Sequence, residues 1–76
     1  MPEVLEAKAA YKQADKDALE MRARARARLG LAVAQERKKG STQPQIAEVL
    51  EVVPEQVRRY EAAYNAWSKA HPGETP

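Results

Sequence analysis

The chain has 76 residues, which is enough for one small domain with a modest core. It has no Cys and no Phe, and its commonest residues are strong helix formers, so disulfides and thiolate-bound metals are excluded and an all-α fold is expected. The net charge is +2, no apolar run has the length of a membrane span, and the N-terminus lacks a signal-peptide core, so we expect a cytoplasmic protein with no membrane partner.

A long helix is predicted over residues 1–28. Pro2 suits the first turn of a helix, and residues 3–28 contain neither Pro nor Gly. Apolar residues recur along it in alternating steps of three and four positions: Val4, Ala7, Tyr11, Ala14, Ala18, Met21 and Ala25. This heptad-like, Ala-rich stripe can support close packing of helices, but it is weak evidence for a free-standing coiled coil.

Gly30 predicts a break or kink at Leu29–Gly30, followed by a shorter helix that ends at Lys39. Apolar residues continue the helical pattern beyond the break. Gly40 is a natural stop for this helix, and Lys38 and Lys39 suit the negative end of the helix dipole.

Two more helices are predicted before the chain ends. Thr42 can cap the first of them, with Gln45 reaching back to the Thr42 N–H in a capping box. After a short connector, Pro54 begins the last helix, which should stop before Pro72. The apolar stripe of this last helix consists of Val57, Tyr60, Tyr64 and Trp67. Residues 72–76 are expected to form a disordered tail.

A short helix, a tight turn and a longer helix form the helix-turn-helix plan. The plan requires a small residue where the two helices cross, and Ala47 supplies it. It also requires apolar residues that face one core, which here are Ile46, Leu50, Val52, Val57 and Tyr60. These spacings are mutually consistent, so we predict a helix-turn-helix at roughly residues 43–62, within a compact three-helix domain over residues 29–71.

The run from Gly40 to Glu61, GSTQPQIAEVLEVVPEQVRRYE, resembles the helix-turn-helix of bacterial repressors of the Cro/repressor type. It is also similar to the three-helix, homeodomain-like module of resolvases, invertases and transposases, which fits the chain length better. These families usually have Gly where this chain has Glu51, and a Ser or Thr cap where it has Val53. The resemblance implies a sequence-specific protein that binds double-stranded DNA, namely a small transcriptional repressor or other regulator. It is compatible with a homodimer that matches DNA half-sites.

The candidate DNA-binding residues of the two motif helices are Thr42, Gln43, Gln45, Glu55, Gln56, Arg58, Arg59 and Ala62. In such motifs the early residues of the second helix meet base edges in the major groove. Arg58 or Arg59 suits a bidentate contact with guanine, and Glu55 can accept from cytosine. Ion pairing of the arginines with Glu55 or Glu61 is the alternative role. The start of the preceding helix is a site for a phosphate oxygen.

Basic residues gather in the middle of the chain, between acidic flanks: Arg22, Arg24, Arg26, Arg28, Arg37, Lys38 and Lys39. This distribution predicts a localised contact with a polyanion, and a solvated charged helix is the alternative. The four alternating arginines could form an extended arm in the minor groove, but a helix that still contacts phosphate is favoured. For the two lysines, the alternative role is stabilisation of a helix end.

Tyr11, Tyr64 and Trp67 are candidate interface residues. Tyr64 and Trp67 lie beyond the minimal three-helix core, so they are expected to pack on Tyr11, Leu19 or Val4, or to meet a second chain. Exposed, they would form an apolar patch of the kind that marks an interface. The rival hypothesis is therefore a protein-interaction adaptor, and a third is an architectural or recombination-accessory DNA binder.

No enzymatic function, cofactor, metal or small-molecule ligand is expected. His71 is the only histidine and stands beside Pro72 near the end of the chain. Ser41 and Ser68 have no plausible general base, and the carboxylates do not have metal-ligand spacing.

Overall fold

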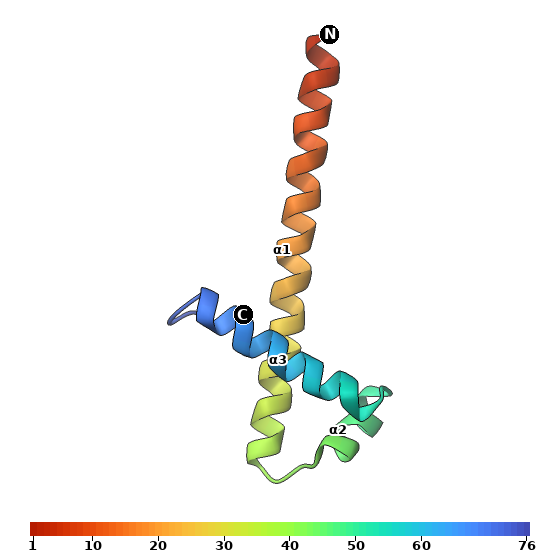
Figure 1. Ribbon diagram of the computed structural model, residues 1–76, viewed down its shortest axis with the longest axis vertical. Coiled ribbons are helices and arrows are strands. Elements are labelled where there is room, and N and C mark those ends of the chain that lie inside the picture. Colours follow the sequence, from red (N-terminus) through yellow and green to blue (C-terminus); the bar gives the residue numbers. More distant parts are fainter.

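The computed structural model describes all 76 residues and contains three helices and no strands, which confirms the all-α fold. The helices are α1 (Pro2–Lys38), α2 (Gln43–Leu50) and α3 (Pro54–Ala70). Figure 1 shows α1 as a long rod, with α2 and α3 packed around its C-terminal part. The molecule measures 59 Å along its longest axis and 13 Å along its shortest, so it is a small helical module at the end of a projecting helix.

The break expected at Leu29–Gly30 does not occur, because α1 continues without interruption through both residues. α3 crosses α1 at this point. A Cβ on Gly30 would overlap the Tyr60 carbonyl oxygen and lie 2.8 Å from the Tyr64 Cβ. Ala27, one turn earlier, is fully buried. Glycine at this position therefore lets the two helix backbones approach closely. The packing of α3 on α1 compensates for the helix propensity of glycine, which is about 1 kcal/mol less favourable than that of alanine.

The core of the module contains the predicted core residues except Tyr60, together with one residue of α1. It consists of Val33 from α1, Ile46 and Ala47 from α2, and Val57 from α3, with Leu50 and Val52 packed against it. Val57 is completely buried and Ala47 is 3% exposed. Only seven of the 76 residues are buried, so each core side chain accounts for a large share of the apolar burial that stabilises the module.

The start of α2 carries the predicted capping box. The Gln45 N–H donates to Thr42 Oγ1 at 3.3 Å, and the Thr42 N–H donates to Gln45 Oε1 at 2.8 Å. α3 begins without such a cap, because its N-cap residue, Val53, has no side-chain acceptor. Between the two helices, Glu51 takes a left-handed conformation with φ 58° and ψ 41°. The turn thus has the geometry that glycine usually supplies, although a glutamate occupies it.

Glu51→Gly is expected to raise the free energy of unfolding by about 0.5–1 kcal/mol. A left-handed residue with a Cβ costs about 1–2 kcal/mol, and the greater freedom of glycine in the unfolded chain cancels part of the gain. Urea denaturation measures the change. Glu48→Gly, one turn earlier in α2, is the control and should lower stability by about 1 kcal/mol. A loss of stability in both variants would contradict the left-handed turn.

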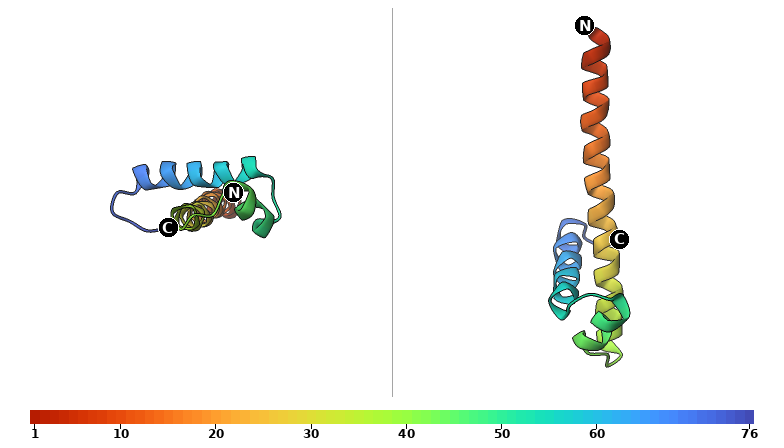
Figure 2. Two further views of the ribbon diagram at one scale, coloured as in Figure 1. Left: turned by 90° about the horizontal axis from the view of Figure 1, so that it is seen from below. Right: turned by 90° about the vertical axis from the view of Figure 1, so that its right-hand side faces the viewer.

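The C-terminal residues turn back towards α1 (Figure 2). The ring of His71 stacks on Trp67 with centroids 4.2 Å apart, and the His71 N–H donates to the Trp67 carbonyl at 3.0 Å. One further turn follows, in which the Glu74 N–H donates to the His71 carbonyl at 3.1 Å. The stacked ring and this backbone hydrogen bond therefore mark the C-terminal end of α3.

Candidate nucleic-acid interface

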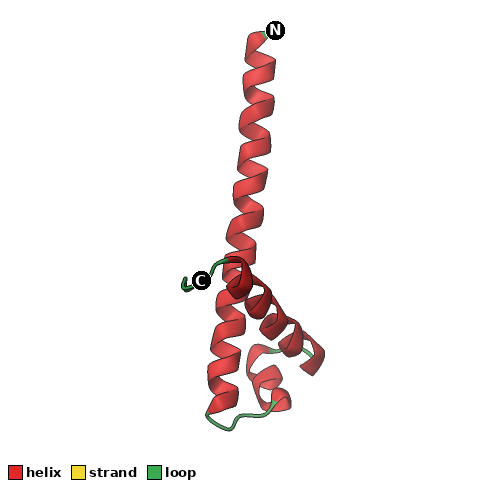
Figure 3. Cartoon of the chain, turned by 60° about the vertical axis from the view of Figure 1, so that its left-hand side comes forward, coloured by secondary structure: helices red, strands yellow, loops and turns green.

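α3 lies across α1 (Figure 3). One face of α3 therefore packs against the rest of the module, and the opposite face is exposed to solvent. The exposed residues recur in steps of three and four positions: Glu55, Arg58, Arg59, Ala62, Asn65, Ala66 and Lys69. We call these residues the outer face of α3. Gln56, another predicted site residue, is half-buried and lies off this face.

The two arginines of the outer face are held only loosely. The guanidinium groups of Arg58 and Arg59 lie 3.7 and 3.9 Å from the carboxylate of Glu55, and their side chains are 69% and 63% exposed. Exposed pairs at these helical spacings contribute only about 0.3–0.5 kcal/mol each. The ion pairing considered for the arginines is therefore present with Glu55, but it is weak enough for an incoming anion to displace.

Glu61, the other carboxylate considered as a partner for these arginines, pairs instead with α1. Arg37 Nη1 donates to both of its carboxylate oxygens, at 3.0 and 3.1 Å. This contact links the end of α1 to the middle of α3 across 24 residues of sequence. Arg37 is therefore engaged within the fold, which leaves Arg58 and Arg59 with a single shared carboxylate.

Asn65 and Lys69 lie on the outer face but are absent from the sequence-based set of candidates. The signal that could have identified them is the continuation of the spacing from Ala62, in steps of three and then four. An amide can make a bidentate contact with adenine, and an ammonium group can bind phosphate. With these residues the outer face carries hydrogen-bond donors along the whole of α3, on both sides of the small residue Ala62.

The start of α2 has fewer free side-chain groups to bind DNA than the sequence suggests. Thr42 Oγ1 and Gln45 Oε1 are occupied by the capping box, which leaves the Gln45 amide NH₂ and the side chain of Gln43. Lys39 forms an exposed ion pair with Glu36 at 3.3 Å, as expected for a residue that stabilises the end of a helix. Lys38 lies in the last turn of α1.

The four alternating arginines belong to α1 and do not form an extended arm. Helical geometry divides them between two sides. Arg22 and Arg26 lie against α3, where they border a shallow depression with Ala63 and Ala66, and the Arg26 guanidinium is 5.9 Å from the centre of the Tyr60 ring. Arg24 borders a different depression on the other side of Trp67, and Arg28 borders neither. The run is therefore two pairs of cations rather than one patch.

The aromatic residues predicted as an interface do not form one exposed patch. Trp67 is 8% exposed and packs within the chain, and Tyr64 is half-buried at the crossing with Gly30. The three residues proposed as their partners, Val4, Tyr11 and Leu19, are 59%, 77% and 57% exposed, so none of them is buried by Tyr64 or Trp67. Of the candidate interface residues, only Tyr11 is exposed.

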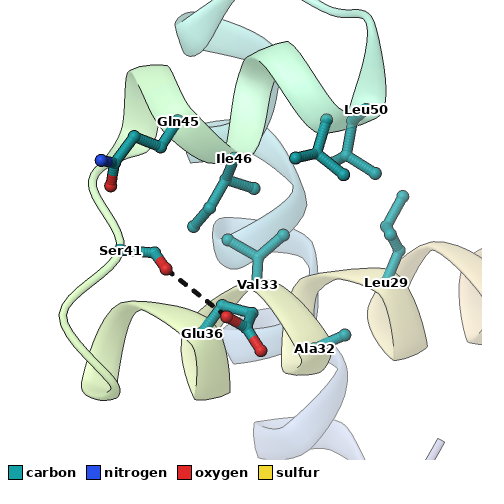
Figure 4. Close-up of a pocket in the computed structure, with 9 residues that line it drawn as sticks. Leu29, Ala32, Val33, Glu36, Ser41, Gln45, Ile46 and Leu50 are labelled. Atoms are coloured by element: carbon teal, nitrogen blue, oxygen red, sulfur yellow. Dashed lines mark hydrogen bonds between the residues drawn. The ribbon is translucent and has the colours of Figure 1, made fainter.

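A second feature of the module is an apolar groove of about 460 Å³ between α1 and α2 (Figure 4). Its apolar lining consists of Leu29, Ala32, Val33, Ile46, Val49 and Leu50. At one end, the Ser41 hydroxyl donates to Glu36 at 3.4 Å. Val49 is 82% exposed, so the groove is open to solvent along α2.

No group of three or more metal-ligating side chains comes together in the structure. None of the three helices combines the length and apolar character required to cross a membrane. Comparisons of the chain with protein-family models, with curated proteins and with solved structures found no match.

Proposed function

We propose that this protein binds double-stranded DNA in a sequence-specific way, with the outer face of α3 in the major groove. The observation that carries the proposal is the pair Arg58 and Arg59 on the exposed face of α3, which follows α2 after a tight turn. Their side chains are more than 60% exposed and only weakly paired. Arginine forks match the paired acceptors of guanine in the major groove.

The rest of the module supports this proposal. The capping box at Thr42 stabilises the start of α2, and the left-handed residue Glu51 forms the turn between α2 and α3. The close crossing at Gly30 holds α3 against α1. Recognition requires such rigid support, because a misplaced fork loses both of its hydrogen bonds to the base.

The biological role that we propose is regulation of transcription. A protein that occupies an operator blocks access to the DNA, so repression is the outcome we expect. Expression of a reporter gene that carries a selected binding site in its promoter would measure the repression.

The test begins with selection of a binding site from random duplexes and titration by fluorescence anisotropy. Arg58→Ala and Arg59→Ala are each expected to weaken binding to the selected site by about 5- to 150-fold, which corresponds to 1–3 kcal/mol. At least one of them should also relax the base preference at one position. Lys12→Ala is the matched control, because it removes one exposed cation from the part of α1 that projects away from the module.

Lys12→Ala should leave the affinity and the base preference nearly unchanged. Equal affinities and preferences in all three variants would contradict the assignment of α3 as the reading helix. Absence of any selected duplex would contradict the proposal as a whole.

A protein-interaction adaptor is the second candidate function, and the groove between α1 and α2 favours it. Apolar grooves accept the apolar face of a partner helix. Val49→Asp would place a charge in this groove without disturbing the buried core, because Val49 is 82% exposed. Loss of a protein partner in this variant, together with unchanged DNA binding, would favour the adaptor for that surface.

A further inference from the structure

The N-terminal part of α1 is a helix with nothing packed against it. Residues 1–17 are all exposed, and Val4, Tyr11 and Met21 are 59%, 77% and 73% exposed. An isolated helix of this length is only marginally stable in water, so a partner that covers its apolar side would stabilise it.

The apolar side is the stripe of Val4, Ala7, Tyr11, Ala14, Ala18 and Met21. With 3.6 residues per turn, this stripe lies largely on the side of α1 opposite Ala27, which α3 buries. A second helix can therefore lie along the stripe without displacing α3, and its end at Met21 would lie beside the depression that Trp67 and His71 border. The steps of three and four positions are those of a helix that packs against another helix.

We propose that the occupant is a second copy of this chain, whose α1 pairs with the stripe in the antiparallel direction. The two-fold axis passes between Lys12 and Gln13. This register opposes Tyr11 to Ala14 of the second copy, Ala7 to Ala18, and Val4 to Met21. A bulky tyrosine thus meets a small alanine, which avoids a layer of two tyrosines at the centre of the interface. The layer of Ala7 and Ala18 is the smallest, and it lets the two helices approach closely there.

The charges that flank the stripe select this register. Glu3 lies beside Arg24 of the second copy and Lys8 lies beside Asp15, and the symmetry repeats both attractive pairs. A shift by one heptad in one direction opposes Lys8 to Lys8. A shift in the other direction opposes Asp15 to Asp15 and Asp17 to Asp17. Of these three antiparallel registers, only the proposed one has attractive side-chain pairs and no repulsive ones.

The parallel arrangement is less favourable for two reasons. It opposes Tyr11 to Tyr11 next to a layer with two Ala14 residues, so neighbouring layers differ greatly in volume. It also brings the two arginine runs side by side, whereas the antiparallel arrangement places each run beside the acidic N-terminus of the other chain. These effects outweigh the pairs Glu3–Lys8 and Asp17–Arg22 that a parallel dimer would also form.

The first test is cysteine crosslinking of the full chain, which has no natural cysteine. Val4→Cys and Met21→Cys, purified separately and mixed, are expected to give a disulfide-linked dimer under mild oxidation. Each variant alone should give none, because residues of the same number lie about 25 Å apart in this register, and a disulfide requires Cα atoms within about 7 Å. Crosslinking of either variant alone would instead indicate a parallel dimer and overturn the proposal.

The second test is sedimentation equilibrium of charge variants. Lys8→Asp turns two attractive pairs into repulsive ones and is expected to raise the dissociation constant of the dimer about tenfold. Adding Asp15→Lys should restore it. Circular dichroism verifies that the module stays folded, because neither residue contacts it. A monomeric parent chain, or failure of the second substitution to restore dimerisation, would overturn the proposal. DNA is absent from both tests, so their failure would leave the proposed function untouched.

Discussion

Gly30→Ala is expected to lower the free energy of unfolding by about 1–2 kcal/mol, although alanine is the better helix former. The added Cβ would overlap the backbone carbonyl oxygen of Tyr60 and approach the Tyr64 Cβ to 2.8 Å. A backbone atom cannot turn aside as a flexible side chain can, so α1 and α3 must separate. Overpacking typically costs about 1–3 kcal/mol, and an overlap with a backbone atom belongs to the upper part of this range. Subtracting the propensity gain of about 1 kcal/mol leaves a net loss of about 1–2 kcal/mol. Thermal and urea denaturation measure the effect.

Ala25→Gly is the matched control for this prediction. Ala25 is exposed on the same helix, so its replacement reports the propensity difference alone and should cost about 1 kcal/mol. If Gly30→Ala instead stabilises the protein by a similar amount, then α3 does not cross α1 at Gly30.

The double variant Arg22→Gln with Arg26→Gln is expected to weaken DNA binding on all sequences and to reduce the salt dependence of binding. These arginines lie beside α3, next to Ala63 and Ala66. In the proposed complex they would reach the phosphates that flank the major groove. Each lost phosphate contact lowers the slope of log affinity against log salt by about 0.9, so the pair should lower it by about 1.8. The base preference should survive, because Arg58 and Arg59 are unchanged.

Arg24→Gln with Arg28→Gln is the matched control, since it removes the same charge from the other side of α1. Helix propensity is nearly the same for arginine and glutamine, so both double variants should stay folded. A slope that falls equally in both variants would indicate a general electrostatic effect. A slope that falls in neither would mean that the arginine run does not contact DNA and would favour the adaptor.

Local signals in the sequence predicted much of the module. The capping box of Thr42 and Gln45, the start of α3 at Pro54, and the shared core of Ala47 and Val57 follow from short-range spacing and appear in the structure. In each case, residues within a few positions of one another determine the geometry.

The features that the sequence did not predict depend on contacts between distant segments. Gly30 indicates a helix break when only its neighbours are considered, and its actual role becomes clear only when Tyr60 lies against it. The pair Arg37–Glu61 and the burial of Trp67 likewise depend on the way α3 crosses α1. The candidate site residues in the first half of the outer face of α3 were predicted, whereas Asn65 was not. The prediction was limited to the first turns of the helix, where the contacts with bases are expected.

The uninterrupted course of α1 makes it a strut that joins the projecting end of the molecule to the module (Figure 1). With 1.5 Å of rise per residue, the 17 or 18 residues between the proposed two-fold axis and Gly30 would hold two modules about 50 Å apart. Any residue inserted into this strut would lengthen it and also rotate the attached module by about 100°. Spacing and angular phase along a DNA duplex would therefore change together, and the length of α1 would act as a ruler that admits only certain separations of two binding sites.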